Sequence, residues 1–210
     1  DVLASADVIY ARNLDMLACA FLAKRHAKLD TPVIYESLDV HRLLTREDFI
    51  GKIFRAFERS LLRRTIGLVV SSPGFLRNHF EKHYPGLYNP FLVENRLAEG
   101  GDFGHRTTPI SARRLPRQTE TRLRIGWVGN LLFGGRYRSP EDLAAIYDEL
   151  DVVWAGDFME AGFNSSWLLP NRIYEGGYYA TPAIAPAGTE TSAWIARNDC
   201  GFSVSEPLNE

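Results

Sequence analysis

The sequence predicts an α/β protein with two doubly wound domains, each built on a parallel sheet. Two stretches of the chain, residues 1–96 and 122–210, alternate short apolar runs with longer amphipathic segments. Strands that alternate with helices in this way pair in parallel, because each helix carries the chain back across the sheet. Residues 97–121 are instead rich in Gly, Pro, Thr and Arg and have no hydrophobic period, so a linker is expected there.

The first domain is expected to hold four strands with helices between them. Short apolar runs predict the strands at residues 7–10, 32–36, 67–71 and 91–94. The helices are predicted at residues 14–28, at residues 46–64, and from Ser72-Pro73 to about Tyr84. Serine followed by proline is a common helix start, because the serine can cap the helix and proline is tolerated in its first turn.

The second domain is expected to open with the strand LRIGWVGN, which ends at Gly129-Asn130. At such a strand-to-loop edge a ligand phosphate can approach the backbone closely. Ser139-Pro140 followed by two acidic residues predicts the start of a helix that runs to about Leu150. The remaining predicted elements are strands at 151–156, 181–186 and 201–206, a short helix that contains Glu175, and a helix near 191–197.

Composition excludes several classes of protein. The formal net charge of −2 gives no basic field for nucleic acid, so no nucleic-acid partner is expected. The two cysteines, Cys19 and Cys200, lack the spacing of a zinc site and fit a reducing compartment. No apolar run is long enough to span a membrane, and no signal peptide opens the chain. A cytoplasmic protein is therefore expected, without metal or other cofactor.

The most informative segment is LPNRIYEGGYYATPAIAP, residues 169–186. It places the carboxylate of Glu175 in a short helix, where it can accept two hydrogen bonds from a vicinal diol such as a ribose. The amides at the start of the helix can donate to a phosphate. This combination suits a nucleotide sugar, and the alternative is an ordinary helix N-terminus in an α/β protein.

The order of residues in this segment resembles the donor site of the retaining family-four glycosyltransferases of the GT-B fold. In that family Leu-Pro-x-Lys/Arg-x-x-Glu precedes a strand that begins small-Pro-hydrophobic. The matching residues here are Leu169, Pro170, Arg172, Ile173, Tyr174, Glu175, Thr181, Pro182 and Ile184. Many members also have a second glutamate eight positions before the one that matches Glu175. This chain has Trp167 at that position, and Glu160 lies further upstream.

The resemblance implies two Rossmann-like domains with an active site in the cleft between them. It implies transfer of a sugar, with retention of configuration and without a metal, from a nucleoside-diphosphate donor to the hydroxyl of a carbohydrate or lipid-linked acceptor. Glu175 would bind the donor ribose, and Arg172 and Asn130 the diphosphate. The other expected donor-binding residues are Gly129, Arg136, Arg138, Asn164 and Ser165. Two other functions stay open: a non-catalytic module of the same fold that binds nucleotide or sugar, and a nucleotide-sugar epimerase.

Asp39 and His41 are the candidate catalytic residues of the first domain. They follow the predicted strand 32–36, and residues beyond the carboxyl end of a parallel strand face the ligand crevice of such a sheet. GT-B proteins of this kind often place an Asp-x-His group here, near the donor sugar and the acceptor. The alternative is that Asp39 caps a turn and His41 is a surface residue.

The predicted helix 46–64 carries two faces. Ile50, Ile53, Phe54, Phe57, Leu61 and Leu62 form an apolar side, and Lys52, Arg55, Arg59 and Arg63 form a basic stripe interrupted by Glu58. One interpretation is a helix that covers the sheet with its basic face in solvent. The other is peripheral attachment to anionic lipid at the inner face of a membrane.

Both domains are expected to be incomplete relative to the GT-B pattern. The first half of the N-terminal domain is lacking, and only about nine residues separate the strand ending at Gly129 from Ser139. Family members have a helix, a strand and another helix in that interval. We therefore expect a break in a longer protein near Leu132–Phe133.

Overall fold

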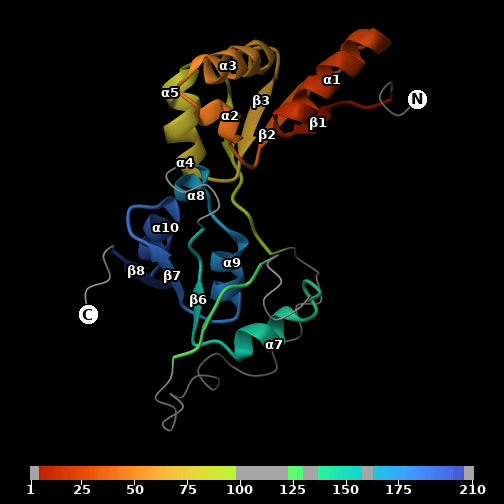
Figure 1. The fold of residues 1–210 in the computed structure, drawn as a ribbon. Coiled ribbons are helices and arrows are strands. Elements are labelled where there is room, and N and C mark those ends of the chain that lie inside the picture. Colours follow the sequence, from red (N-terminus) through yellow and green to blue (C-terminus); the bar gives the residue numbers. More distant parts are fainter. Residues whose placement is uncertain (1–4, 98–122, 130–136, 158–162, 206–210) are drawn as a thin grey trace. The chain divides into compact units, whose positions relative to one another are not determined.

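The computed structural model describes residues 5–97, 123–129, 137–157 and 163–205 (Figure 1). The chain divides into two compact units. The first takes the chain up to Glu94 together with the segment that ends at Leu169, and the second takes the rest. Each unit holds one four-stranded sheet in which all strands are parallel. The α/β class with two parallel sheets is thus confirmed.

The sheet of the first unit runs in chain order β1-β2-β3-β4. Its strands are β1 (Ile9–Arg12), β2 (Val33–Ser37), β3 (Gly67–Val70) and β4 (Pro90–Leu92). Strand β3 is buried along its whole length, because it pairs on both sides and is covered on both faces. The three exposed residues of β4 form one edge of this sheet.

The helices of the first unit are α1 (Asn13–Ala27), α2 (Arg42–Thr45), α3 (Phe49–Leu62), α4 (Pro73–Phe75) and α5 (Glu81–His83), with a π-helix, η1 (Leu76–Phe80), between the last two. Helix α8 (Asn164–Trp167) joins them from much later in the chain and packs on α4. The backbone of Trp167 comes so close to Gly74 that a Cβ there would overlap it. Only glycine therefore fits at this position.

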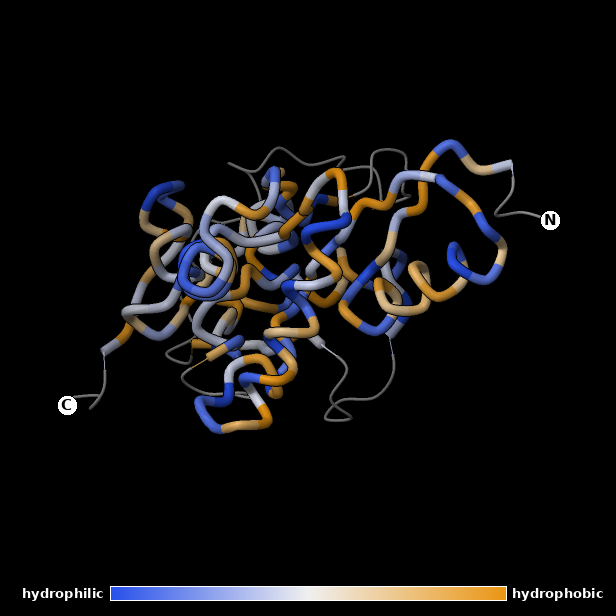
Figure 2. Tube along the Cα trace, turned by 90° about the horizontal axis from the view of Figure 1, so that it is seen from above, coloured by the Kyte–Doolittle hydropathy of each residue, from blue (hydrophilic) through white to orange (hydrophobic). Residues whose placement is uncertain are grey.

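The core of the first unit gathers apolar residues from β1, β2, β3 and the helices. Its largest fully buried side chains include Tyr35, Phe75, Phe80 and Tyr84. Figure 2 shows hydrophobic and hydrophilic residues interspersed along the chain.

The sheet of the second unit has the order β5-β6-β7-β8. Its strands are β5 (Ile125–Gly126), β6 (Val152–Trp154), β7 (Ala183–Pro186) and β8 (Gly201–Val204). The described helices are α7 (Leu143–Asp148), α9 (Asn171–Tyr178) and α10 (Glu190–Asn198). Helix α9 packs on β6 and β7, and α10 packs on β7 and β8.

Several predicted features differ from the structure or fall outside it. The strand expected at 7–10 is Ile9–Arg12, and the strand expected to end at Gly129-Asn130 is only Ile125–Gly126. The helix expected to begin at Pro140 begins at Leu143, since residues 139–142 form turns. The helix expected at 46–64 is shorter, since α3 runs from Phe49 to Leu62. Asp48 caps its first turn by accepting a hydrogen bond from the Gly51 amide at 3.0 Å. The break expected near Leu132–Phe133 lies outside the described residues. Among the described helices, none is long and apolar enough to cross a membrane.

Candidate functional site

Arg172 ties the first turn of α9 to the ends of two neighbouring strands in the second unit. Its two terminal guanidinium nitrogens, Nη1 and Nη2, donate to the carbonyl oxygens of Val128 and Gly156, each at 3.3 Å. Val128 follows β5 and Gly156 follows β6, so the arginine joins the carboxyl ends of both strands. This is the edge at which parallel sheets of this class bind ligands.

The surroundings of Arg172 are aromatic and apolar. Its guanidinium lies 4.9 Å from the centroid of the Trp127 ring, within the range of a cation–π contact. Burial lowers the pKa of Arg172, while nearby Asp157 and Glu175 act in the opposite direction. Nε is buried, and no described residue accepts a hydrogen bond from it. The group keeps its positive charge and leaves one donor unused at this edge.

Glu175 lies one turn beyond Arg172 and is half-buried. Its Oε2 accepts a hydrogen bond from the hydroxyl of Tyr147 at 2.8 Å. Tyr147 is itself buried and stacks on Tyr179, with the ring centroids 5.1 Å apart. Burial raises the pKa of the Glu175 carboxyl, although the Tyr147 hydrogen bond and the charge of Arg172 lower it. The carboxylate is therefore held through Oε2, and among the described residues none donates a hydrogen bond to Oε1.

The other residues predicted for donor binding lie at different places in the chain. Gly129 follows β5, close enough to Trp127 that a Cβ on it would overlap the indole ring. Arg138 is exposed and pairs with Asp142 at 2.9 Å. Asn130 and Arg136 lie outside the described residues.

Asn164 and Ser165 are in α8, and α8 belongs to the first unit rather than to the unit of Glu175. The Asn164 side chain accepts from the Val40 amide at 3.1 Å and donates to Asp39 Oδ1 at 3.2 Å. Ser165 is buried. The structure thus brings together Asn164 and Asp39, which stand 125 positions apart in the chain.

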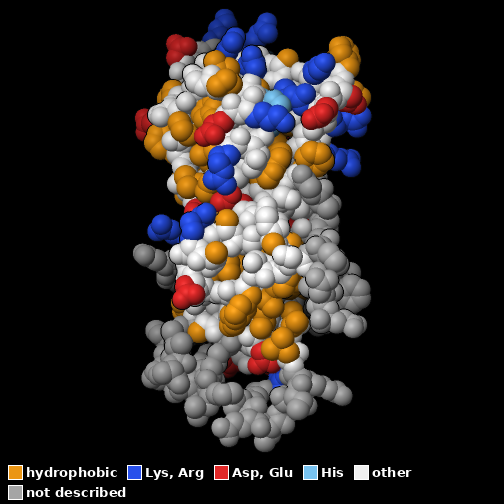
Figure 3. Space-filling view, turned by 90° about the vertical axis from the view of Figure 1, so that its left-hand side faces the viewer, with side chains coloured by type: hydrophobic (Ala, Val, Ile, Leu, Met, Phe, Trp, Pro, Cys, Tyr) orange, Lys and Arg blue, Asp and Glu red, His pale blue; other side chains and the backbone are white. Residues whose placement is uncertain are grey.

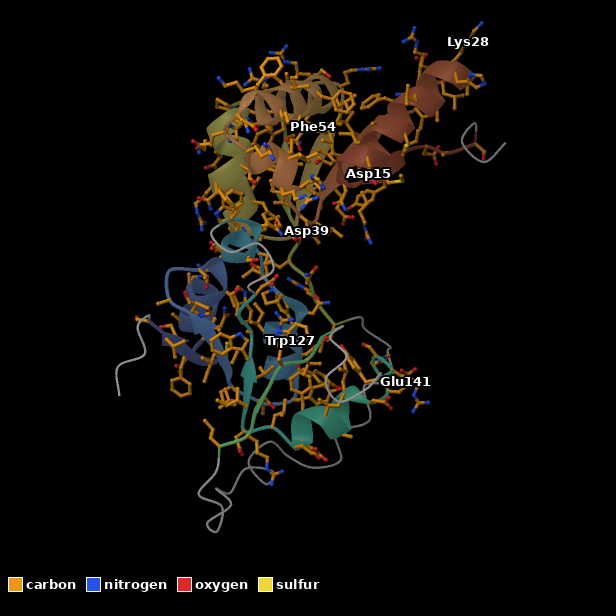
Figure 4. The ribbon with its side chains drawn as sticks, in the orientation of Figure 1. Asp15, Lys28, Asp39, Phe54, Trp127 and Glu141 are labelled. Atoms are coloured by element: carbon orange, nitrogen blue, oxygen red, sulfur yellow. The ribbon has the colours of Figure 1, made fainter. Side chains whose placement is uncertain are left out.

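Asp39 and His41, the candidate catalytic residues, both lie beyond the carboxyl end of β2 and are exposed. Figure 4 labels Asp39. The imidazole of His41 caps α2, because its Nδ1 accepts from the Leu43 amide at 3.3 Å. Asp39 contacts Asn164 and does not contact a described cation. The capping role expected as the alternative for Asp39 thus falls on His41.

A group of polar side chains that sequence reasoning missed lies at the ends of β1 and β2. The buried carboxylate of Glu36 accepts from the Tyr10 hydroxyl at 3.0 Å and from Arg12 Nε at 2.7 Å. Burial, followed by the Glu36 carboxylate, raises the pKa of Tyr10 to about 12. The sequence could have indicated this group, because Arg12 ends β1 and Glu36 is the next-to-last residue of β2, and the two strands were expected to be neighbours.

Tyr147 and Trp127 were also missed as parts of the site around Glu175. Tyr147 stands in a helix whose apolar spacing marks it only as a core residue, and Trp127 reads as part of a strand. Among the described residues, no group of three or more His, Cys, Asp or Glu side chains could hold a metal ion.

Comparison with known proteins shows a similarity to a protein of polysaccharide synthesis. No protein-family model matches the chain. The chain is 36% identical over 240 residues to the succinoglycan biosynthesis protein ExoL of Rhizobium meliloti (strain 1021), a match that covers 93% of this chain. It spans 60% of the length of that relative. The match is longer than this 210-residue chain, so ExoL has internal segments that this chain lacks.

Proposed function

We propose that this chain is part of a glycosyltransferase of polysaccharide synthesis, which moves a sugar from a nucleoside-diphosphate donor to an acceptor hydroxyl. The similarity over 93% of the chain to a protein named for succinoglycan biosynthesis carries this proposal. The donor-type segment around Glu175 supports it independently, since that segment was recognised from its residues alone.

The proposed architecture is the GT-B fold, with the family-four group as its nearest kin. Two parallel α/β units in one chain are consistent with it. The proposed chemistry is transfer with retention of configuration and without a metal. The positive charge of Arg172 would stabilise the departing diphosphate together with backbone amides near Gly129 and Asn130.

Glu175 would bind the ribose of the donor. Each carboxylate oxygen can accept two hydrogen bonds, and Tyr147 uses one position on Oε2. A vicinal diol could therefore donate to Oε1 and to the free position of Oε2. In the first unit, His41 and Asp39 would lie near the transferred sugar or the acceptor.

A direct experiment uses the full-length protein with labelled nucleotide sugars. Release of nucleoside diphosphate that depends on an acceptor supports a transferase, whereas interconversion of the sugar without an acceptor would identify an epimerase. A thermal-shift panel of UDP, GDP, ADP and their sugars would identify the donor base, because a ligand that binds the native state raises its melting temperature.

Glu175→Ala tests the donor site. The variant should weaken donor binding at least about tenfold, since a charge-assisted hydrogen bond to the ribose is lost. The matched control is Glu141→Ala, which removes an exposed carboxylate from the same unit (Figure 4). Equal donor affinity in both variants would contradict the assignment of Glu175.

A non-catalytic binding module of the same fold is the second candidate. Trp167 supports it, because it stands where many family-four enzymes have a second glutamate. In this structure the residue belongs to α8, and its carbonyl accepts a hydrogen bond from Ser72. Donor binding without turnover, with every acceptor tested, would favour this function over a transferase.

A further inference from the structure

Helix α3 exposes an apolar strip instead of burying it. Phe49, Ile50, Ile53 and Phe57 have relative exposures of 75%, 45%, 50% and 44%. They follow the spacing of one helix face, and the buried face of α3 is formed by Gly51, Glu58, Leu61 and Leu62. Phe54 is partly buried against the core (Figure 4). The apolar side of this helix is therefore split between the core and the surface.

A basic pocket lies beside this strip, between α3 and α5. It has a volume of about 290 Å³ and is lined by Lys52, Arg55, Ala56, Arg59, His83 and Tyr84. Figure 3 shows Lys and Arg side chains gathered with hydrophobic ones over the first unit, with a histidine among them. In the part of the chain that the structure describes, no carboxylate lies within ion-pair distance of Lys52, Arg55 or Arg59.

The pocket is held in shape by contacts that leave its charges unneutralised. Arg59 donates to the carbonyl oxygen of His83 at 2.5 Å and lies over the Tyr84 ring, 5.6 Å from its centroid. Arg55 donates to the carbonyl oxygens of Leu44 and Arg46 at 2.6 and 2.5 Å. Neutral carbonyls thus position two guanidinium groups, and an anion between them would gain charge-assisted hydrogen bonds.

Acidic residues lie around the pocket but do not line it. Glu58 is buried beneath Tyr84 and accepts the Tyr84 hydroxyl at 2.6 Å. Glu47 and Glu81 are exposed, and Asp48 pairs with Arg46. Neighbouring His83 is half-buried, and burial followed by the positive charges around it lowers its pKa to about 4. It therefore stays neutral near pH 7 and can donate one hydrogen bond.

We propose that α3 lies on an anionic membrane surface, with a lipid phosphate in the pocket of Lys52, Arg55 and Arg59 and the apolar strip among the acyl chains. An interfacial helix has this combination of a basic face and a large apolar face. The basic pocket would contact the lipid headgroups, and the apolar strip would contact the acyl chains beneath them. This inference does not depend on the proposed function.

The test measures binding of the full chain to vesicles of phosphatidylcholine alone and of phosphatidylcholine mixed with phosphatidylglycerol. Wild-type protein should bind the mixed vesicles and not the neutral ones. Lys52→Gln with Arg59→Gln should weaken binding about thirty-fold, since each basic residue near an anionic surface contributes about five-fold. Arg25→Gln in α1 with Lys28→Gln at its C-cap removes the same charge and should leave binding nearly unchanged.

The apolar strip has its own matched pair. Ile53→Ser with Phe57→Ser should weaken binding at least about tenfold, because exposed apolar side chains gain free energy only when they leave water. Met16→Ser with Leu22→Ser, which changes two exposed apolar residues of α1, should not. Lys52→Glu changes a single exposed side chain and reverses its charge, so it should bind still more weakly than Lys52→Gln.

Several outcomes would overturn the proposal. Absence of binding to mixed vesicles would do so, as would equal losses in the α1 and α3 charge variants, which would indicate non-specific attraction. Saturable binding of inorganic phosphate without vesicle binding would assign the pocket to a free anion. Concentration-dependent self-association that Ile53→Ser with Phe57→Ser abolishes, with vesicle binding unaffected, would assign the strip to a second copy of the chain.

Discussion

Glu58 is expected to be a major source of stability in the first unit, and its replacement tests how the buried polar groups are satisfied. Its side chain is fully buried in α3. The carboxylate accepts from the hydroxyls of Tyr35 and Tyr84 at 2.9 and 2.6 Å, and Oε2 lies 2.7 Å from His79 Nε2. In the tautomer that carries its proton on Nε2, His79 donates to Oε2, and the carboxylate then accepts all three hydrogen bonds.

The expected cost of Glu58→Ala follows from these three contacts. Each hydrogen bond to a charged group contributes about 1.5–3 kcal/mol, and the donors left behind would be buried without an acceptor. Removing one partner of a buried charged group costs about 3–5 kcal/mol. We therefore expect Glu58→Ala to lower the free energy of unfolding of the first unit by about 5 kcal/mol. Tyr35→Phe, which removes one donor and leaves two, should cost about 2 kcal/mol.

Hydrogen exchange in urea at the amides of β2, β3 and α3 would measure the free energy of unfolding of the first unit, because it reports on this unit separately from the second. Glu81→Ala, an exposed change on α5, is the control and should leave exchange unchanged. A loss below about 2 kcal/mol in Glu58→Ala would refute the reasoning, since it would mean that water or a rearranged partner replaces the carboxylate. A loss in Tyr35→Phe as large as in Glu58→Ala would show that the tyrosine ring packing, and not the carboxylate, dominates.

Three further predictions concern other parts of the chain. Tyr147→Phe should weaken donor binding only a few-fold by titration calorimetry, since Glu175 keeps its charge but loses the hydrogen bond at 2.8 Å that orients it. Burial raises the pKa of Glu175, so its carboxylate becomes protonated at a higher pH than an ordinary glutamate does. Donor affinity should therefore fall as the pH drops through that raised pKa. A donor affinity that does not change with pH would argue against an ionised carboxylate at the ribose. Thr189→Ala removes the capping box of α10, in which the Thr189 hydroxyl accepts from the Ser192 amide at 3.1 Å, and should cost about 1 kcal/mol in thermal unfolding, whereas Thr189→Ser should cost little.

The stability of the first unit should also depend on pH through His83. Its pKa in the folded state is lowered to about 4 from an ordinary value of 6.5, so the folded state resists protonation that the unfolded state accepts. The resulting stability is present above about pH 6.5 and is lost as the pH falls toward 4. His83→Asn should flatten this part of the curve of stability against pH in urea unfolding.

Local patterns in the sequence placed most of the strands and helices. The strands at Val33–Ser37 and Gly67–Val70 coincide closely with the predicted runs 32–36 and 67–71, because buried parallel strands are short, apolar and bounded by turn residues. Helix ends were less predictable. Ser139-Pro140 has the residues of a helix start, yet the helix begins at Leu143, since the turn of residues 139–142 satisfies the backbone instead.

The orientation of α3 could not be predicted from its periodicity. The pattern offers a broad apolar sector, and the core takes Leu61 and Leu62 but leaves Ile53 and Phe57 in solvent. The deciding residue is Glu58, which turns inward because three donors from β2, η1 and the residue after α5 converge on it. Those donors come from 21 to 26 positions away in the chain, so no local window contains the information.

The candidate site was predicted in part. Arg172 and Glu175 share one helix, and their spacing was visible in the motif. Their partners were not, because Tyr147 and the carbonyls of Val128 and Gly156 reach them only through tertiary packing. Asn164 was assigned to the donor segment from its neighbours in sequence, and its contact with Asp39 in the first unit depends on a return of the chain that the sequence does not signal.

That return of the chain has a consequence for how the protein is made. A ribosome releases residues 5–94 long before Asn164 and Trp167, which supply partners for Val40, Asp39 and Ser72. Until β5, β6 and α8 have been synthesised, Gly74 in the early segment therefore lacks its contact with the Trp167 backbone. A polypeptide truncated after residue 97 would carry this gap permanently, and a short peptide spanning residues 163–169, added in trans, would be the natural way to close it.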